Sequence, residues 1–219
     1  MRITERDIDI IRWIDSFGYV TAEQVFREFG FSPKRGYRRL RLLVGEKYLL
    51  HKRIFFGRPG IYQAGGQGLA LIADDPECVP GLAPVRAATM EHNLLLVDLA
   101  QLLVRKTGGA WKTDRQIRRE RGFDLRMAVR PHVPDGILTL PGGKTIAVEL
   151  ELTAKGTQRL EKILKGYARA AEYREVWYFV RRPALAQKIG ELTRKMPFVK
   201  TYLLEEVFRH GGESEPVTR

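Results

Sequence analysis

Apolar residues recur at helical spacing in three segments near the start of the chain. Ile8, Ile11 and Ile14 form one such stripe. Residues with side-chain oxygens at a helix start, and glycine just past its end, satisfy backbone groups that a helix leaves unpaired. The capping residues are Thr4 and Gly18 for the first helix, Thr21 and Gly30 for the second, and Ser32-Pro33 for the start of the third. The pattern therefore predicts three short helices.

Two apolar segments of strand character follow, at residues 50–56 and 61–64, joined by Gly57-Arg58-Pro59-Gly60. Glycine and proline between two such segments are typical of a turn, so a hairpin is predicted. Residues 1–72 then form a first domain. Residues 73–84 contain three prolines and three acids without a periodic apolar pattern, and we interpret them as a linker.

Residues 85–210 alternate between helical and strand patterns and form a second predicted domain. We expect a helix over 86–106, a strand near 111–117, a hairpin over 134–153, a helix over 160–171, a strand over 175–180, a helix from Pro183 and a strand over 198–204. This order predicts an α+β protein with a mixed sheet flanked by helices. The tail, residues 211–219, is predicted to be disordered.

The charge of the chain narrows the range of functions that it could have. Its 219 residues include 38 Lys and Arg against 26 Asp and Glu, which gives a formal net charge of +12 and a pI near 10.0. A protein this basic most often binds a polyanion. The charged amino terminus is unlike a signal peptide, and the apolar run 94–104 is too short to span a bilayer. The single cysteine, Cys78, excludes an intrachain disulfide framework. We therefore expect a cytoplasmic protein with no membrane partner.

The third predicted helix has an unusual density of positive charge. Five basic residues fall within eight positions with no acid among them: Lys34, Arg35, Arg38, Arg39 and Arg41. Arg53 and Arg58 lie in the hairpin that follows. Three short helices and a hairpin resemble a winged helix-turn-helix, whose third helix enters the DNA major groove. The resemblance implies that these seven residues bind double-stranded DNA. A solvated basic face and a protein-interaction module are the alternatives.

The segment 134–155, PDGILTLPGGKTIAVELELTAK, gathers three carboxylates. A turn with two central glycines sets Gly136 opposite Glu149. Side chains alternate along a strand, so Glu149 and Glu151 share a face and Asp135 lies close by. Like charges this close repel one another unless a cation or a proton intervenes. Because Mg²⁺ and Mn²⁺ prefer oxygen ligands, we expect Asp135, Glu149 and Glu151 to form a metal site. The alternative is a solvent-facing polar strand.

Pro134-Asp135, the glycine-rich hairpin and Glu149 resemble the core of the PD-(D/E)XK nuclease superfamily. In that core the second strand reads acid-x-lysine, whereas Glu151 occupies the lysine position here. Lys155 stands where a lysine transferred to the following helix would lie. The resemblance implies Mg²⁺- or Mn²⁺-dependent cleavage of DNA. Asp135 and Glu149 would hold the metal, and Glu151 or Lys155 would position or deprotonate the attacking water.

His132 also precedes this motif. A lone histidine in a loop is usually structural, and we interpret it so. A catalytic role is the alternative.

Four further short segments, together with the winged-helix-like start, carry another resemblance. They are His92-Asn93, Trp111-Lys112-Thr113-Asp114, Val133-Pro134-Asp135-Gly136 and Val148-Glu149-Leu150-Glu151-Leu152-Thr153. Together they resemble the replication-relaxation family of plasmids and other mobile elements. The resemblance implies DNA binding in replication control or mobilisation, alongside other replication or mobilisation proteins. Because DNA readers often pair on two half-sites, we expect a homodimer. The alternative is a non-enzymatic winged-helix regulator whose second domain serves dimerisation or partner binding.

Overall fold

The computed structural model describes residues 2–76, 78, 81–122, 132–153 and 156–209. The chain divides into two compact units, residues 1–98 and 99–219. This division falls inside helix α5 (Ala87–Thr107), whereas the sequence analysis placed a linker at residues 73–84. Ile72, Cys78 and Val97 all belong to the hydrophobic core of the first unit, which therefore extends past that segment. The tail predicted to be disordered, 211–219, lies outside the described residues.

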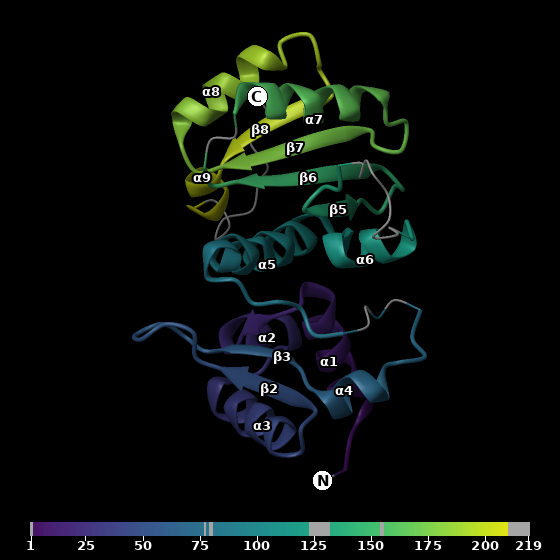
Figure 1. Ribbon diagram of the computed structural model, residues 1–219, viewed down its shortest axis with the longest axis vertical. Coiled ribbons are helices and arrows are strands. Elements are labelled where there is room, and N and C mark those ends of the chain that lie inside the picture. The colour runs from purple at the N-terminus through teal and green to yellow at the C-terminus, as the bar shows by residue number, and fades with distance from the viewer. Residues whose placement is uncertain (1, 77, 79–80, 123–131, 154–155, 210–219) are drawn as a thin grey trace. The chain divides into compact units, whose positions relative to one another are not determined.

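The first unit contains the three predicted helices and a small sheet (Figure 1). Its elements before α5 are α1 (Glu5–Phe17), β1 (Val20–Thr21), α2 (Ala22–Phe29), α3 (Pro33–Gly45), β2 (Leu49–Lys52), β3 (Ile61–Ala64) and α4 (Gly66–Leu71). The predicted caps are confirmed. Thr4 and Thr21 form capping boxes, and Gly18 and Gly30 follow the helix ends at positive φ.

The sheet of the first unit is antiparallel, with the strand order β1-β3-β2. The sequence did not predict β1, because two residues are too few to show an alternating pattern. The strand predicted over 50–56 was too long. β2 ends at Lys52, which lies opposite Ile61 at the start of β3, so residues 53–60 form the connection between the strands. The short α4 was also missed, because its glycine-rich sequence is typical of a loop.

Side chains from α1 and α3 fill much of the core of the first unit. The most deeply buried are Ile10, Ile11 and Ile14 of α1 and Leu40 and Leu43 of α3. Burial of each such side chain contributes about 1.5–3 kcal/mol relative to leaving it exposed. α2 approaches α3 closely at Gly36, where a Cβ atom would lie 2.1 Å from the Phe26 ring. A larger residue at this position would push the two helices apart.

The second unit is built on a five-stranded mixed sheet with the order β4-β5-β6-β7-β8 (Figure 1). Its elements after α5 are β4 (Ala110–Thr113), α6 (Asp114–Glu120), β5 (Gly136–Thr139), β6 (Thr145–Glu151), α7 (Thr157–Arg169), β7 (Glu175–Val180), α8 (Pro183–Leu192), β8 (Val199–Leu203) and α9 (Leu204–Arg209). β4, β5 and β6 are antiparallel neighbours, whereas β6, β7 and β8 are parallel. The predicted α+β class and mixed sheet are confirmed. Within the described ranges, none of the helices has the length and apolar content that a membrane crossing requires.

The strand predicted near residues 111–117 was partly wrong. β4 stops at Thr113, whose hydroxyl accepts a hydrogen bond from the Gln116 backbone N–H and so caps α6. Thr113 and Gln116 form a capping box, and this local signal outweighs the strand character of the preceding residues. Ile117 is buried, but it belongs to α6 and not to a strand. The short α9 was missed because it follows β8 with no turn residue between them.

The β5–β6 hairpin differs by one residue from the predicted register. Gly136 lies opposite Val148, and not opposite Glu149. The turn is longer than predicted, because the Gly143 N–H donates to the carbonyl three residues earlier at 2.8 Å and Gly143 adopts a φ of 79°. Three-residue hairpin loops commonly end in such a glycine. The shift sets Asp135 level with Glu149, one position beyond the paired residues.

The side chains of β6 alternate between two buried faces. Ala147 packs with Leu160 and Leu164 of α7, in a cluster that also includes residues of β7 and α8. Figure 1 shows α7 and α8 running along this face of the sheet. Glu149 and Glu151 share the face of Ala147, and both are buried. The alternative of a solvent-facing polar strand is therefore wrong.

Candidate functional site

The outer side of α3 presents four of the five predicted cations to solvent. Gly36, Leu40 and Leu43 turn the opposite side of the helix towards the core. No ion pair joins any of the four cations to an acid within the part of the chain that the structure describes. The four are Lys34, Arg35, Arg38 and Arg41. Their charges are therefore available to an external anion.

Arg39, the fifth of these residues, is engaged inside the first unit. Its Nε donates to Asp7 Oδ1 at 2.6 Å, and its Nη2 donates to Asp7 Oδ2. Asp7 is only 2% exposed and also accepts from the Thr4 backbone N–H at 2.8 Å. Burial alone would raise the pKa of Asp7, but the hydrogen bonds from Arg39 and Thr4 outweigh it and lower that pKa. Arg39 thus ties α3 to the start of α1.

The connection between β2 and β3 combines basic and aromatic side chains on a loop that extends from the sheet (Figure 1). Arg53 and Arg58, both predicted to bind DNA, are exposed. Between them Phe56 is fully exposed and Phe55 is 40% exposed. The Arg58 guanidinium lies 5.9 Å from the centroid of the Phe55 ring. Sequence reasoning missed the two phenylalanines because it assigned them to a strand with an apolar face.

The second unit places the predicted carboxylates on and beside β6. Asp135 immediately precedes β5, and its Oδ2 accepts the Leu150 backbone N–H at 2.8 Å. Glu149 is 1% exposed and Glu151 is 5% exposed. The hairpin register explains the arrangement, since it sets Asp135 level with Glu149. Buried carboxylates require hydrogen bonds, a cation or protonation.

Two neighbours hold Glu149. The Tyr167 hydroxyl, on α7, donates to Glu149 Oε1, and His132 Nε2 lies 2.5 Å from the same oxygen. The rings of His132 and Tyr167 also meet edge to face, with centroids 5.6 Å apart. His132, interpreted from the sequence as structural, is therefore in direct contact with a carboxylate of the candidate site. When His132 is protonated this contact is an ion pair.

Tyr178 lies beside Glu149 on the parallel strand β7. Its side chain is fully buried, and its hydroxyl has no hydrogen-bond partner among the described residues. Burial raises the pKa of Tyr178, and the negative charges of Glu149, Glu151 and Asp135 raise it further. Burial likewise raises the pKa of Tyr167, with Glu149 adding to the effect. Both phenols therefore stay protonated at neutral pH and remain donors beside the acids.

Asp114 is a further acid of this region that sequence reasoning did not assign. It begins α6, immediately after β4, and its Oδ2 accepts from Arg118 Nε at 3.3 Å. Burial raises the pKa of Asp114. Arg118 opposes this shift, whereas the charge of Asp135 adds to it. An acid in the first turn of a capped helix is usually explained by the helix dipole. The sequence therefore offered no reason to expect Asp114 near Asp135.

The remaining sequence predictions for this site concern Lys155 and a bound metal ion. Lys155, the candidate catalytic lysine, lies outside the described residues. The His, Cys, Asp and Glu side chains of the described ranges form no group of three or more that could hold a metal ion as they are placed. The arrangement is a buried, negatively charged region with phenol donors at its edge. Such a region favours entry of a cation or of protons.

No protein-family model, curated protein or solved structure matches the chain. A function for each unit is therefore inferred from the residues described above.

Proposed function

We propose that the protein binds double-stranded DNA through its first unit, as a winged helix-turn-helix protein. The order of the elements supports this fold, with a short strand between the first two helices and a hairpin after the third. The observation that carries the proposal is the exposed basic side of α3. Four cations lie there without an acidic partner in the described ranges. An α-helix of this charge suits the DNA major groove.

The proposal gives the basic residues different roles. Arg38 and Arg41 are exposed and reach base edges or phosphates, whereas Arg39 is held by Asp7 and serves the fold. The β2–β3 connection lies against the neighbouring backbone or minor groove. There Arg58 pairs with phosphate and Phe56 supplies an apolar contact.

A mobility-shift assay with a labelled duplex tests this proposal. We expect Arg38→Ala/Arg41→Ala to weaken binding strongly, because it removes two contacts while leaving the core unchanged. The matched control is Arg182→Ala/Arg194→Ala, which removes two exposed arginines of the second unit and the same charge. Equal binding by the parent and the α3 variant would contradict the proposal. If the control variant bound DNA equally weakly, the loss of affinity would be an effect of net charge and not of α3.

A second candidate function, metal-dependent DNA hydrolysis, is favoured by the acids around Tyr178. The sheet order and the acids on β6 support a PD-(D/E)XK-like fold. Asp135 and Glu149 would hold Mg²⁺ or Mn²⁺, which supplies Lewis acidity and lowers the pKa of a bound water. The carboxylate oxygens of these two residues fit such a cation, and the Tyr178 hydroxyl, a buried donor with no partner among the described residues, would donate to an oxygen of a bound water or phosphate. Glu151 or Lys155 would position or deprotonate the attacking water, as expected from the sequence.

Incubation of supercoiled plasmid with Mg²⁺ or Mn²⁺ tests the second function. We expect nicked circles from the parent and none from Asp135→Asn/Glu149→Gln, which keeps the shape of both side chains but removes their charge. Nicking by both proteins would contradict the assignment of the site. DNA binding without nicking by either would favour the non-enzymatic regulator.

Both units together support membership of the replication-relaxation family as a further part of the proposal. The protein would then read DNA in the replication control or mobilisation of a plasmid or another mobile element. We also propose that it binds as a homodimer on two half-sites. Light scattering of the DNA complex measures this directly, and one protein copy on a full site would contradict it.

A further inference from the structure

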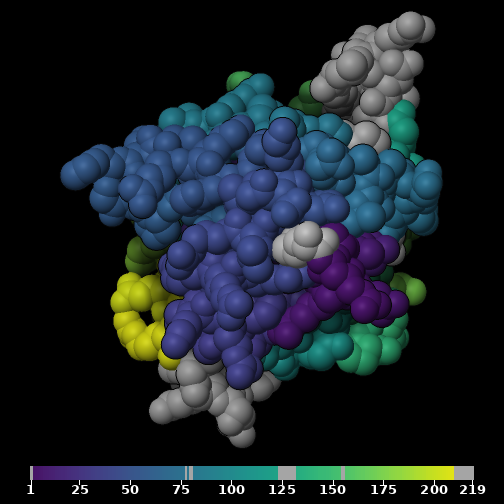
Figure 2. All heavy atoms as spheres, turned by 90° about the horizontal axis from the view of Figure 1, so that it is seen from below, coloured from purple at the N-terminus to yellow at the C-terminus, as the bar shows by residue number. Residues whose placement is uncertain are grey.

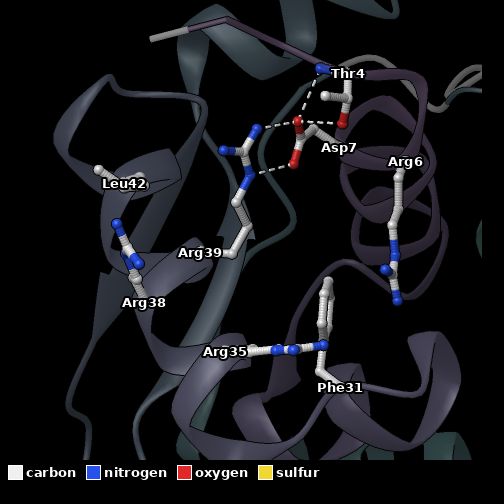
Figure 3. Close-up of a pocket in the computed structure, with 8 residues that line it drawn as sticks. All are labelled: Thr4, Arg6, Asp7, Phe31, Arg35, Arg38, Arg39 and Leu42. Atoms are coloured by element: carbon white, nitrogen blue, oxygen red, sulfur yellow. Dashed lines mark hydrogen bonds and ion pairs between the residues drawn. The ribbon is translucent and has the colours of Figure 1, made fainter.

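A pocket of about 380 Å³ opens in the first unit between the start of α1 and the outer side of α3. Figure 3 shows its lining side chains, and Figure 2 shows the residues of α3 next to the purple amino-terminal residues on this surface. The lining residues are Thr4, Arg6, Asp7, Phe31, Arg35, Arg38, Arg39 and Leu42. This volume is at the small end of the usual range for ligand sites, about 300–1,000 Å³.

The lining is strongly positive. Four arginines and one aspartate contribute a formal net charge of +3. The aspartate, Asp7, is already neutralised by Arg39 through two hydrogen bonds (Figure 3). The charges of the other three arginines therefore face the pocket without compensation from its walls.

Arg6 is oriented by contacts that leave its charge intact. Its guanidinium lies 4.0 Å from the centroid of the Phe31 ring and donates to the Phe29 carbonyl. Neither partner is charged. In the view of Figure 3, Arg6 and Arg35 lie on either side of Phe31. Two guanidinium groups from different helices are thus presented to one concave site.

We propose that this pocket holds one phosphate group of the DNA backbone, clamped between Arg6 of α1 and Arg35 of α3. The forked guanidinium matches the oxygens of phosphate, and a concave site with uncompensated positive charge disfavours cations. Phe31 and Leu42 provide apolar walls for the adjoining sugar. This inference rests on the proposed function, and it adds α1 to the DNA-binding surface.

Salt dependence tests the clamp, because each phosphate contact contributes about 0.9 to the slope of log Kobs against log[salt]. Arg6→Gln and Arg35→Gln each remove one arm of the same contact. The double variant removes both arms and so loses one phosphate contact, and we expect it to lower the slope by about 0.9, which makes the affinity loss between 50 and 200 mM salt about 3.5-fold smaller. Each single variant should lower the slope by less, because the remaining arginine still pairs with the phosphate. Adding Arg41→Ala to the double variant should lower the slope by about 0.9 more, because Arg41 contacts a separate phosphate.

Three outcomes are distinguishable, provided that melting curves show folded variants. A slope lowered by about 0.9 in the Arg6→Gln/Arg35→Gln double variant, and by less in each single variant, supports the clamp. DNA binding by the parent with an unchanged slope in the double variant, or with a slope lowered by about 1.8, overturns it. If the parent does not bind DNA, the proposed function fails, and inorganic phosphate at constant ionic strength becomes the probe. A rise in Tm with phosphate, lost in Arg35→Gln, then assigns the pocket to free phosphate, and no rise overturns the site altogether.

Discussion

Replacing Arg39 with alanine distinguishes its structural role from the DNA-binding role proposed for the neighbouring arginines. The change removes both hydrogen bonds to a carboxylate that is 2% exposed. Loss of one partner from a buried ion pair costs about 3–5 kcal/mol. The Arg39 side chain is 25% exposed and Thr4 still donates to Asp7, so we expect a smaller loss, about 2–3 kcal/mol of the free energy of unfolding. Arg38→Ala, one residue earlier on the exposed side, should change stability by less than about 0.5 kcal/mol.

The loss of stability should also depend on pH. The pKa of Asp7 in the folded protein lies below its ordinary value of 3.8. A carboxyl group with a lowered pKa stabilises the folded state above its unfolded pKa, and this contribution disappears as the pH falls through the lowered value. The difference between the parent and Arg39→Ala should therefore be largest at neutral pH and should narrow as the pH falls towards about 4 and below, because burial raises the pKa of Asp7 once Arg39 is gone.

Urea unfolding at pH 7 and at pH 3, followed by circular dichroism, measures both effects. Arg39→Lys is a useful second variant, because it keeps the charge but loses the paired hydrogen bonds. The reasoning is refuted if Arg39→Ala unfolds with the same free energy as the parent at pH 7. It is also refuted if the loss is equally large at both pH values, since the Asp7 charge would then have no part in it.

The other features lead to three shorter predictions. Phe56→Ser should weaken duplex binding in an anisotropy titration but leave the unfolding free energy within about 0.5 kcal/mol, because this side chain is fully exposed. Tyr167→Phe should cost about 1–3 kcal/mol in urea unfolding, because it removes a donor from the buried Glu149; an unchanged value would count against that contact. Mn²⁺ should raise the Tm of the parent but not of Asp135→Asn, and equal shifts would place the metal elsewhere.

Local signals were enough to predict most elements of the fold. The capping boxes at Thr4 and Thr21 mark the starts of α1 and α2, because each satisfies backbone groups in its own turn, and proline at the first position of α3 marks the start after Ser32. The strand over 175–180 was also placed correctly, since a short apolar run is characteristic of a buried parallel strand. The length of β2 was predicted wrongly because strand pairing decides it: the end of β2 depends on where β3 begins, and no local pattern contains that information. The strand predicted near 111–117 was too long because the local capping box at Thr113 and Gln116 was overlooked.

The candidate sites show the same contrast between local signals, which could be predicted, and long-range contacts, which could not. The sequence was sufficient to select Asp135 and Glu149, but the hairpin register depended on one glycine at positive φ, which shifted the pairing by a residue. Partners distant in sequence were not predictable. Tyr167 and His132 reach Glu149 only through the packing of α7 and the path of the chain before β5. Charge alone could not distinguish Arg39 from Arg38. The two side chains leave α3 in different directions, and only Arg39 reaches Asp7.

The central claim is that the exposed arginines of α3 neutralise DNA phosphates. The most direct measurement is a titration of labelled duplex with the parent and with Arg38→Ala/Arg41→Ala across a range of salt concentrations. We predict that log Kobs falls steeply with log[salt] for the parent, and that the double variant lowers this slope by up to about 1.8. A parent whose affinity does not change with salt, or a double variant with the parent's slope and affinity, would contradict the account.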